Sequence, residues 1–190
     1  HSTSRRQRQM CIRDSIFTGQ WLKFSNRGND IHLIEAQIRE SFRFPEIVDE
    51  QNLQMVEYLK TVNSVAIHAR RGDALGGLAW CYKYGYFKRA VKYIRKHVDN
   101  PEFVFFTNPG SVEWCRDNAK LFGLDIRKDT IKFVDWNKGE DSFRDMQLMA
   151  MCKHNIIVPS SFGWWGTFFN TNPNKITISP SITINTTNHC

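Results

Sequence analysis

No run of apolar residues in this 190-residue chain approaches the roughly 20 that a membrane span requires. The opening segment HSTSRRQRQM also has no apolar core of the kind that a secretory leader contains. The five cysteines are odd in number, lie far apart and form no C-x-x-C pair. The sequence therefore predicts no integral membrane segment, no disulfide framework and no zinc site. We expect reduced thiols and a cytoplasmic location, either free or peripheral to the membrane.

Positive charge is in slight excess, and much of that excess lies at one end of the chain. The net charge is +7, and the first fifteen residues contain four arginines and one aspartate. We predict that residues 1–15 are a disordered or foreign basic tail outside the fold. The milder positive charge of the remainder suits an anionic ligand or nucleic acid, and it is equally typical of an ordinary solvated surface.

Beyond the tail, short apolar runs alternate with segments of helical periodicity. The periodicity predicts helices from about residue 30 and over 50–61, 86–97, 111–122, 142–152 and 162–169. In the second of these helices, the apolar face should contain Leu53, Val56 and Leu59. The apolar runs predict strands over 65–67, 103–106, 131–134, 156–158 and 175–179. This alternation indicates an α/β fold with a doubly wound, parallel, Rossmann-like sheet over residues 63–190, preceded by a helical remnant of another region over 16–62.

The first cluster of candidate site residues, HARRGD over 68–73, directly follows a predicted strand. Ligands of such folds lie beyond the carboxyl ends of the strands, and a guanidinium matches the oxygens of a phosphate. Strand alternation places His68 and Arg70 on one side and Arg71 on the other, so only one arginine can share a ligand with His68. For Arg71, an ion pair with Asp73 that holds the loop is an equally good interpretation.

The second cluster, VPSSFGWW over 158–165, joins a strand to a helix through Ser160 and Ser161. This arrangement directs the free N–H groups and the positive end of the helix toward the same edge of the sheet, where they suit a phosphate. Serine is also an ordinary N-cap residue, so the pattern by itself fits either role. We expect Trp164 and Trp165 to belong to the core rather than to a ligand platform.

One carboxylate and one absence complete the candidate site. Asp145, one turn into the helix predicted over 142–152, is either a solvated charge or an acceptor for a base or ribose. No Asp-x-Asp occurs in the chain, so the carboxylate pair that commonly holds Mg²⁺ or Mn²⁺ on a diphosphate is missing. We therefore predict a diphosphate site without a metal, in which arginine and helix-terminal N–H groups offset the charge.

Two motifs together resemble those of the α-1,2-fucosyltransferases, glycosyltransferase family 11. They are HARRGD at 68–73 and DMQLMAMCKHNIIVPSSFGWWG at 145–166, and the similarity extends from about residue 18 to about residue 180. The resemblance implies a GT-B-like glycosyltransferase, of which this chain is the Rossmann-like half that binds the donor substrate GDP-fucose. No cofactor is implied, and the partners would be this nucleotide sugar and a glycan acceptor, not nucleic acid.

The resemblance also implies roles for single residues. By analogy with the H-x-R-R motif, Arg70 contacts the diphosphate and His68 the nucleoside end of the donor. Asp145 is associated with guanine, and Ser160 and Ser161 with phosphate.

The chain departs from the family pattern at three points. Pro159 stands where asparagine usually precedes the two serines, and a proline donates no backbone N–H. Thr107-Asn108 stands where Ser-Asp is common. The Gly-rich opening segment with Gly-Asn-Gln is absent, so the chain resembles a fragment that lacks the amino-terminal part of the enzyme.

These observations lead to one main hypothesis and two alternatives. The main hypothesis is inverting, metal-independent transfer of fucose from GDP-fucose to a sugar hydroxyl, in an α-1,2 linkage to galactose. Arg70 would stabilise the leaving diphosphate, and Asp73 is the candidate general base because it is the acidic residue of the first motif. The alternatives are a GDP-binding module that is inactive because it is truncated, and a basic nucleic-acid-binding domain.

Overall fold

The computed structural model describes residues 31–71, 79 and 81–180, and it contains two compact units, His1–Glu46 and Ile47–Cys190. In the described part of the first unit, helix α2 (Ile31–Ser41) has an ion pair between Glu35 and Arg39, one turn apart. The predicted tail, residues 1–15, lies outside the described residues, as does Asp73.

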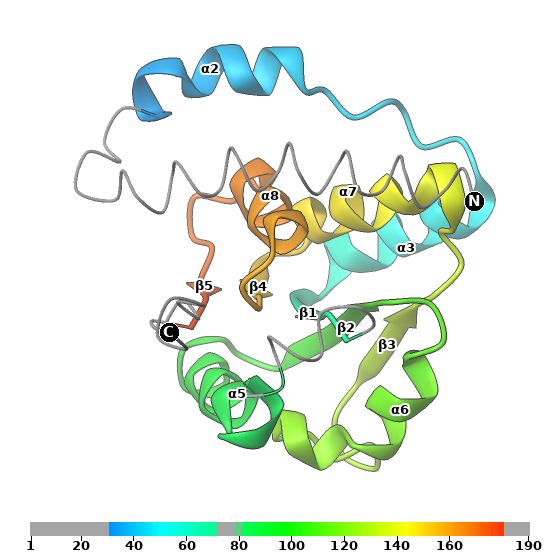
Figure 1. Ribbon diagram of the computed structural model, residues 1–190, viewed down its shortest axis with the longest axis vertical. Helices are drawn as coiled ribbons and strands as arrows, with labels where there is room; N and C mark the ends of the chain where they lie inside the picture. Colours follow the sequence, from blue (N-terminus) through cyan, green and yellow to red (C-terminus); the bar gives the residue numbers. More distant parts are fainter. Residues whose placement is uncertain (1–30, 72–78, 80, 181–190) are drawn as a thin grey trace, which may run out of the picture. The chain divides into compact units, whose positions relative to one another are not determined.

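The second unit is built on a five-stranded sheet in which all neighbouring strands are parallel (Figure 1). The spatial order is β3-β2-β1-β4-β5, so the chain winds outward from β1 in one direction and then in the other. This order confirms the predicted doubly wound α/β fold. The strands are β1 (Asn63–Ala69), β2 (Pro101–Thr107), β3 (Ile131–Val134), β4 (His154–Ile156) and β5 (Thr177–Ile178).

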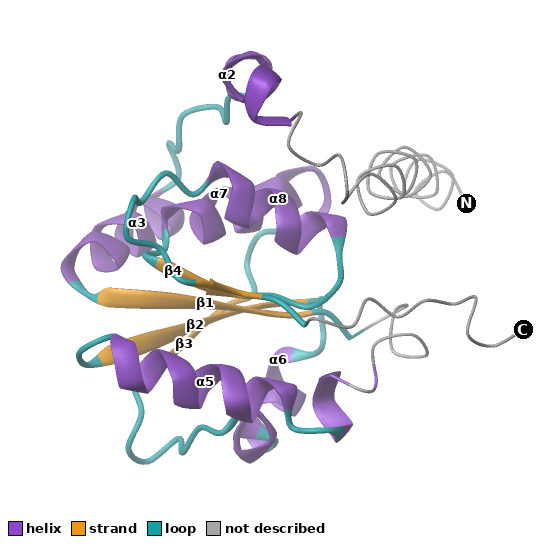
Figure 2. Ribbon diagram, turned by 90° about the vertical axis from the view of Figure 1, so that its left-hand side faces the viewer, coloured by secondary structure: helices purple, strands orange, loops and turns teal. Residues whose placement is uncertain are grey.

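Helices cover both faces of this sheet, as Figure 2 shows with the strands nearly edge-on. One face packs on α5 (Tyr86–His97) and α6 (Val112–Asp117), and the other on α3 (Glu50–Thr61), α7 (Phe143–Met151) and α8 (Ser161–Phe169). Alternate residues of β1 enter the two cores, because successive side chains of a strand point to opposite faces. Val65, Ile67 and Ala69 lie in the core with α5, whereas Ala66 lies in the core with α3 and α7.

The helix predicted over 111–122 is two shorter elements. Helix α6 ends at Asp117, and a 3-10 turn, η2 (Ala119–Phe122), follows. The side chain of Asn118 donates to the carbonyl oxygen of Trp114 at 2.9 Å, a local bond that competes with helix continuation. Gly123 ends the segment at a φ of 78°, in the left-handed region that favours glycine.

Two other details differ from the sequence interpretation. Strand β4 begins at His154 rather than Ile156, because the buried polar residues His154 and Asn155 pair in the sheet. Helix α3 buries Asn52 along with Met55 and Leu59, while Leu53 is 43% exposed. Of the predicted apolar face, Leu59 is buried and Val56 packs against the core, whereas the expectation for Leu53 was wrong. Helix α3 belongs to the same compact unit as the sheet, because that unit begins at Ile47.

None of the helices in the described part of the chain combines the length and the apolar character needed to cross a bilayer.

Candidate functional site

The two predicted motifs meet at the carboxyl edge of the sheet. Arg70 directly follows β1, and its Nη1 lies 3.3 Å from the hydroxyl oxygen of Ser160 at the start of α8. Ninety positions separate the two residues in the sequence. They meet because β1 and β4 are adjacent parallel strands, whose carboxyl ends share one edge. Two of the residues that we predict to bind the diphosphate therefore lie side by side.

Ser160 occupies the N-cap position of α8, but its side chain makes no capping hydrogen bond. Its hydroxyl accepts from Arg70 instead. Helix α8 begins at Ser161 and has nine residues, so its positive end lies beside the Arg70 guanidinium. This arrangement favours the interpretation of an anion site over that of an ordinary capped helix.

His68 is buried beneath this edge, with 5% of its surface exposed. Burial, together with the charge of Arg70, lowers the pKa of His68 to about 3, so the imidazole is neutral at physiological pH. Its ring centroid lies 5.6 Å from that of Phe162. Within the described part of the chain, Nδ1 has no hydrogen-bond partner. A neutral imidazole is suited to hydrogen bonding with a ligand without adding charge.

Gly163 lets α8 approach His68 closely. A Cβ atom built on Gly163 would lie 2.5 Å from Nδ1 of His68, closer than non-bonded atoms allow. Sequence reasoning placed this glycine inside the second motif but assigned it no role. Its position next to a strand-end histidine could not be seen without the fold.

Arg71 lies on the opposite side of the sheet from Arg70, as strand alternation predicted. Its guanidinium carbon lies 3.2 Å from the centroid of the Trp114 ring in α6. Its backbone N–H donates to Oδ1 of Asn108 at 2.6 Å. The alternative interpretation, an ion pair with Asp73, concerns a residue outside the described part of the chain.

Neighbouring side chains anchor the backbone that carries the two arginines. Tyr82 donates to the carbonyl oxygen of Arg70 at 2.8 Å, and Thr107 donates to that of Ala69 at 2.7 Å. Together with Asn108, these contacts hold the segment after β1 from both the next strand and the segment that precedes α5. Thr107 and Asn108 are the residues that depart from the family's Ser-Asp pattern, and here they support the arginines.

Asp145 lies in the first turn of α7, beyond the end of β3. Nδ2 of Asn137 donates to its Oδ1 at 2.8 Å. Burial, and to a lesser extent the nearby charge of Asp135, raises the pKa of Asp145 to about 7, although the bond from Asn137 acts in the opposite direction. A half-buried carboxyl group with such a pKa is typical of a functional site more than of a solvated helix charge.

Comparisons with known proteins identify the family of the chain. The chain matches the family described as "Glycosyl transferase family 11" over residues 21–188. The chain belongs to this family.

Relatives of known name lie within the same family. The chain is 30% identical, over 161 residues, to "Alpha-1,2-colitosyltransferase" of Escherichia coli, covering 80% of this chain and 52% of that protein. It is 27% identical, over 149 residues, to "Galactoside alpha-(1,2)-fucosyltransferase 1" of Saimiri sciureus, covering 72% of this chain and 39% of that protein. This family 11 chain therefore spans about half the length of one relative and about two fifths of the other.

Among solved structures, the chain is similar to an E. coli protein described as trehalose-6-phosphate bound with UDP-2-fluoro glucose. The TM-score is 0.37 at 10% identity, over 70% of this chain and 32% of that chain. The fold of the family 11 chain follows from its own strand order.

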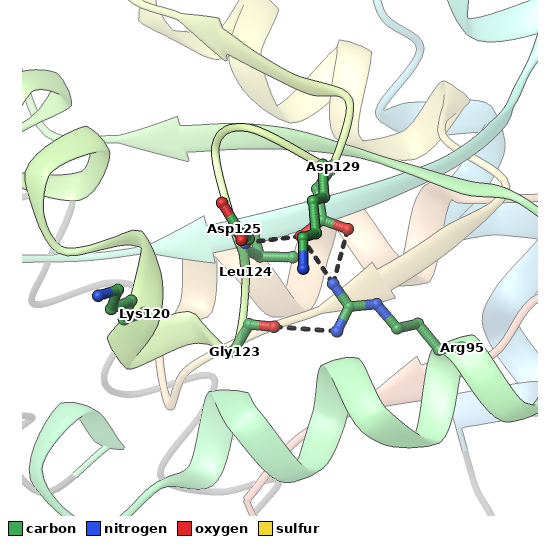
Figure 3. Close-up of a pocket in the computed structure, with 7 residues that line it drawn as sticks. Arg95, Lys120, Gly123, Leu124, Asp125 and Asp129 are labelled. Carbon is green, nitrogen blue, oxygen red and sulfur yellow. Dashed lines mark hydrogen bonds and ion pairs between the residues drawn. The ribbon is translucent and has the colours of Figure 1, made fainter.

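A hollow of about 440 Å³ lies at the other edge of the sheet, where the chain enters β2 and β3 (Figure 3). Nη2 of Arg95 lies 2.7 Å from both carboxylate oxygens of Asp129, and Nη1 lies 3.0 Å from the carbonyl oxygen of Gly123. These contacts tie α5 to the turn before β3, so we assign the hollow a structural role. Among the described residues, no group of three or more His, Cys, Asp or Glu side chains could hold a metal ion.

Proposed function

We propose that this chain is the donor-binding half of a GT-B-like glycosyltransferase that moves fucose from GDP-fucose to a sugar hydroxyl. The proposed linkage is α-1,2 to galactose, formed with inversion and without a divalent metal. The observation that carries the proposal is the meeting of Arg70 and Ser160 at the positive end of α8. Membership of family 11, and the names of the two relatives, support a transferase of this sugar class.

In the proposed complex, Arg70 and the N–H groups at the start of α8, near Ser160 and Ser161, bind the diphosphate. The neutral imidazole of His68, which is buried beside them, accepts or donates one hydrogen bond at the nucleoside end. Asp145 accepts hydrogen bonds from the guanine base. Arg71, stacked on Trp114, supports the loop and adds positive charge to the donor site.

The proposed reaction is a single displacement. The acceptor hydroxyl attacks the anomeric carbon of fucose from the face opposite GDP, and a new C–O bond forms as the bond to the diphosphate oxygen breaks. Negative charge develops on the departing GDP, where Arg70 and the α8 N–H groups stabilise it. The proton of the hydroxyl passes to a general base, for which we propose Asp73.

The test uses calorimetry on the 190-residue chain with GDP, GDP-fucose and UDP, with and without EDTA. We expect both guanine nucleotides to bind, UDP to bind more weakly, and EDTA to have no effect. Arg70→Ala should weaken GDP binding about tenfold or more, because a charge-assisted contact to phosphate is lost. The matched control is Arg127→Ala, which removes an exposed arginine near the opposite edge.

Unchanged GDP affinity in Arg70→Ala, or affinity that disappears with EDTA, would overturn the proposal. A second assay follows fucose transfer to lactose, in which Arg70→Ala should lower turnover about a hundredfold. GDP binding without transfer would favour the second candidate, a truncated donor-binding module. The observation behind this candidate is that the chain covers 52% of its E. coli relative.

A further inference from the structure

A pair of buried asparagines lies between α3, the segment after β3, and α7. Asn52 is 2% exposed and Asn137 is 9% exposed. Nδ2 of Asn52 donates to Oδ1 of Asn137 at 2.7 Å, and Nδ2 of Asn137 donates to Oδ1 of Asn52 at 3.1 Å. The two amide groups therefore form a reciprocal pair, 85 positions apart in the sequence.

The pair ends on a carboxylate at each side. The second N–H of Asn52 donates to Oδ2 of Asp49 at 3.0 Å, and that of Asn137 donates to Oδ1 of Asp145 at 2.8 Å. Nε1 of Trp136 also donates to Oδ1 of Asn52, at 2.8 Å. Because an ionised carboxylate only accepts hydrogen bonds, the two ends determine which atom of each amide is nitrogen. Every N–H of the two amides is used, so their orientation has no freedom.

Asp49 connects this pair to the start of α3. Its Oδ1 accepts from the backbone N–H of Asn52 at 2.9 Å, and it occupies the N-cap position of the helix. These bonds lower the pKa of Asp49, and Arg144 in α7 adds a small favourable charge. Asp49 is thus fixed and ionised. It sets the orientation of the Asn52 amide, which sets that of the Asn137 amide, which donates to Asp145.

Asp145, in the first turn of α7, is the other end of this chain of bonds. The charged and titratable groups that face it are Asp135, from the segment after β3, and through the amide pair Asp49, from α3. Within the described part of the chain, Oδ2 of Asp145 has no hydrogen-bond donor, whereas Oδ1 accepts from Asn137. One oxygen is held by the protein and the other can accept from a ligand.

We propose that Asn52 and Asn137 are positioning residues, which favour the ionised form of the Asp145 carboxyl group and direct it toward the N–H groups of a guanine-type base. The inference rests on the proposed function, because it assigns the base of the donor to this end of the site. It adds two residues to the donor site. The specificity for guanine would depend on the amide pair as well as on Asp145.

The experiment measures the titration of the Asp145 carboxyl by carbon NMR in the 190-residue chain, with Asn137→Ala as the main variant. Removal of one hydrogen bond to the carboxylate should raise the midpoint by about one pH unit. GDP affinity should then fall about fivefold at neutral pH and recover under alkaline conditions, where Asp145 ionises. Inosine diphosphate lacks the exocyclic amino group and makes fewer bonds to the carboxylate. Its affinity should therefore fall less than that of GDP in the same variant.

Two further variants keep the test informative if Asn137→Ala folds poorly. Asn52→Ser should shift the midpoint in the same direction by a smaller amount, because Asn137 is then held only in part. Asn170→Ala is the matched control, since it breaks another buried asparagine pair, with Asn155, 2.7 Å apart. It should leave the midpoint unchanged.

An unchanged midpoint in folded Asn137→Ala or Asn52→Ser would overturn the inference. So would a loss of GDP affinity that is equal at every pH, because a purely structural role predicts that result. Failure of the proposed function gives a different result: the midpoint shifts as expected, but the wild-type chain binds no GDP. That outcome would overturn recognition of the base.

Discussion

Two buried asparagine pairs lie at opposite edges of the sheet, and they differ in their end points. At the carboxyl edge, Asn52 and Asn137 connect two carboxylates. At the amino edge, Asn155 and Asn170 donate to the main-chain carbonyl oxygens of Met149 and Cys152, at 2.9 and 2.6 Å. The same chemical group therefore serves two purposes. A pair that ends on the backbone joins structural elements, whereas a pair that ends on a carboxylate also controls an ionisable group.

The arginines of the two edges show a similar difference. Arg95, at the amino edge, lies between both oxygens of the Asp129 carboxylate and a main-chain carbonyl. Arg70, at the carboxyl edge, contacts the neutral hydroxyl of Ser160 beside a helix N-terminus. The Arg95 contacts join α5 to the turn before β3, whereas the Arg70 contact joins the end of β1 to the N-terminus of α8, where we propose the anion site. The following predictions test that division, in order of decreasing effect.

Gly163→Ala should have the largest effect, because the new Cβ would lie 2.5 Å from buried His68. We expect a loss of about 3 kcal/mol in the free energy of unfolding, the upper range for overpacking, and a loss of GDP binding. Gly166→Ala is the control in the same helix, where the new Cβ would lie 3.1 Å from Met149. Urea unfolding of both variants measures the difference. Equal stability of the two would contradict the close contact with His68.

Asn170→Ala should destabilise the fold but leave the site chemistry intact. The variant removes the buried donor to the side-chain Oδ1 of Asn155 and to the main-chain oxygen of Cys152, at a cost of about 2 kcal/mol. GDP affinity under folding conditions should equal that of the wild type. Urea unfolding and calorimetry on the same sample provide both values. A shift in the pH dependence of GDP binding in this variant would contradict the claim that only the Asn52–Asn137 pair controls an ionisable group.

Asp145→Asn should change how stability depends on pH. Burial raises the pKa of Asp145 from 3.8 to about 7 in the folded chain. Between these values the folded state binds more protons than the unfolded state, so the contribution of Asp145 to stability falls as pH rises. Relative to the wild type, the variant should gain about 2 kcal/mol between acidic and mildly alkaline pH, a value reduced for partial exposure. Urea unfolding of the wild type and the variant across this pH range measures the change, with Asn170→Ala as the reference variant. A stability difference that stays constant with pH would show that Asp145 does not titrate.

Arg95→Ala should have the smallest effect, because the ion pair with Asp129 is partly exposed. We expect a loss of about 0.5–1 kcal/mol, which decreases at high salt, and no change in GDP affinity. Thermal unfolding at two salt concentrations, together with calorimetry, tests both parts. Weakened GDP binding in this variant would show that the hollow at the amino edge contributes to the site.

Much of the fold could be predicted because its signals are local. Alternating apolar runs and helical periods identified the sheet and its covering helices, with errors of a few residues. The errors arose at three asparagines, of which Asn52 and Asn155 are buried. Asn155 extends β4 toward the amino end, Asn52 occupies the buried face of α3, and Asn118 interrupts the helix after Val112. One signal in the sequence could have indicated the buried asparagine of α3. Asn52 lies at helical spacing from Met55 and Leu59, which are buried on the same face.

The sequence by itself determined the α/β class, the two motifs and the divergence of Arg70 from Arg71, because strand alternation and helix periodicity are properties of neighbouring residues. Only the tertiary structure decided which distant residues meet. The approach of Ser160 to Arg70, the close passage of Gly163 over His68 and the bonds from Asn52 through Asn137 to Asp145 depend on strand order and helix packing. Burial and charge, which set the protonation of His68 and Asp145, arise only when those elements pack together.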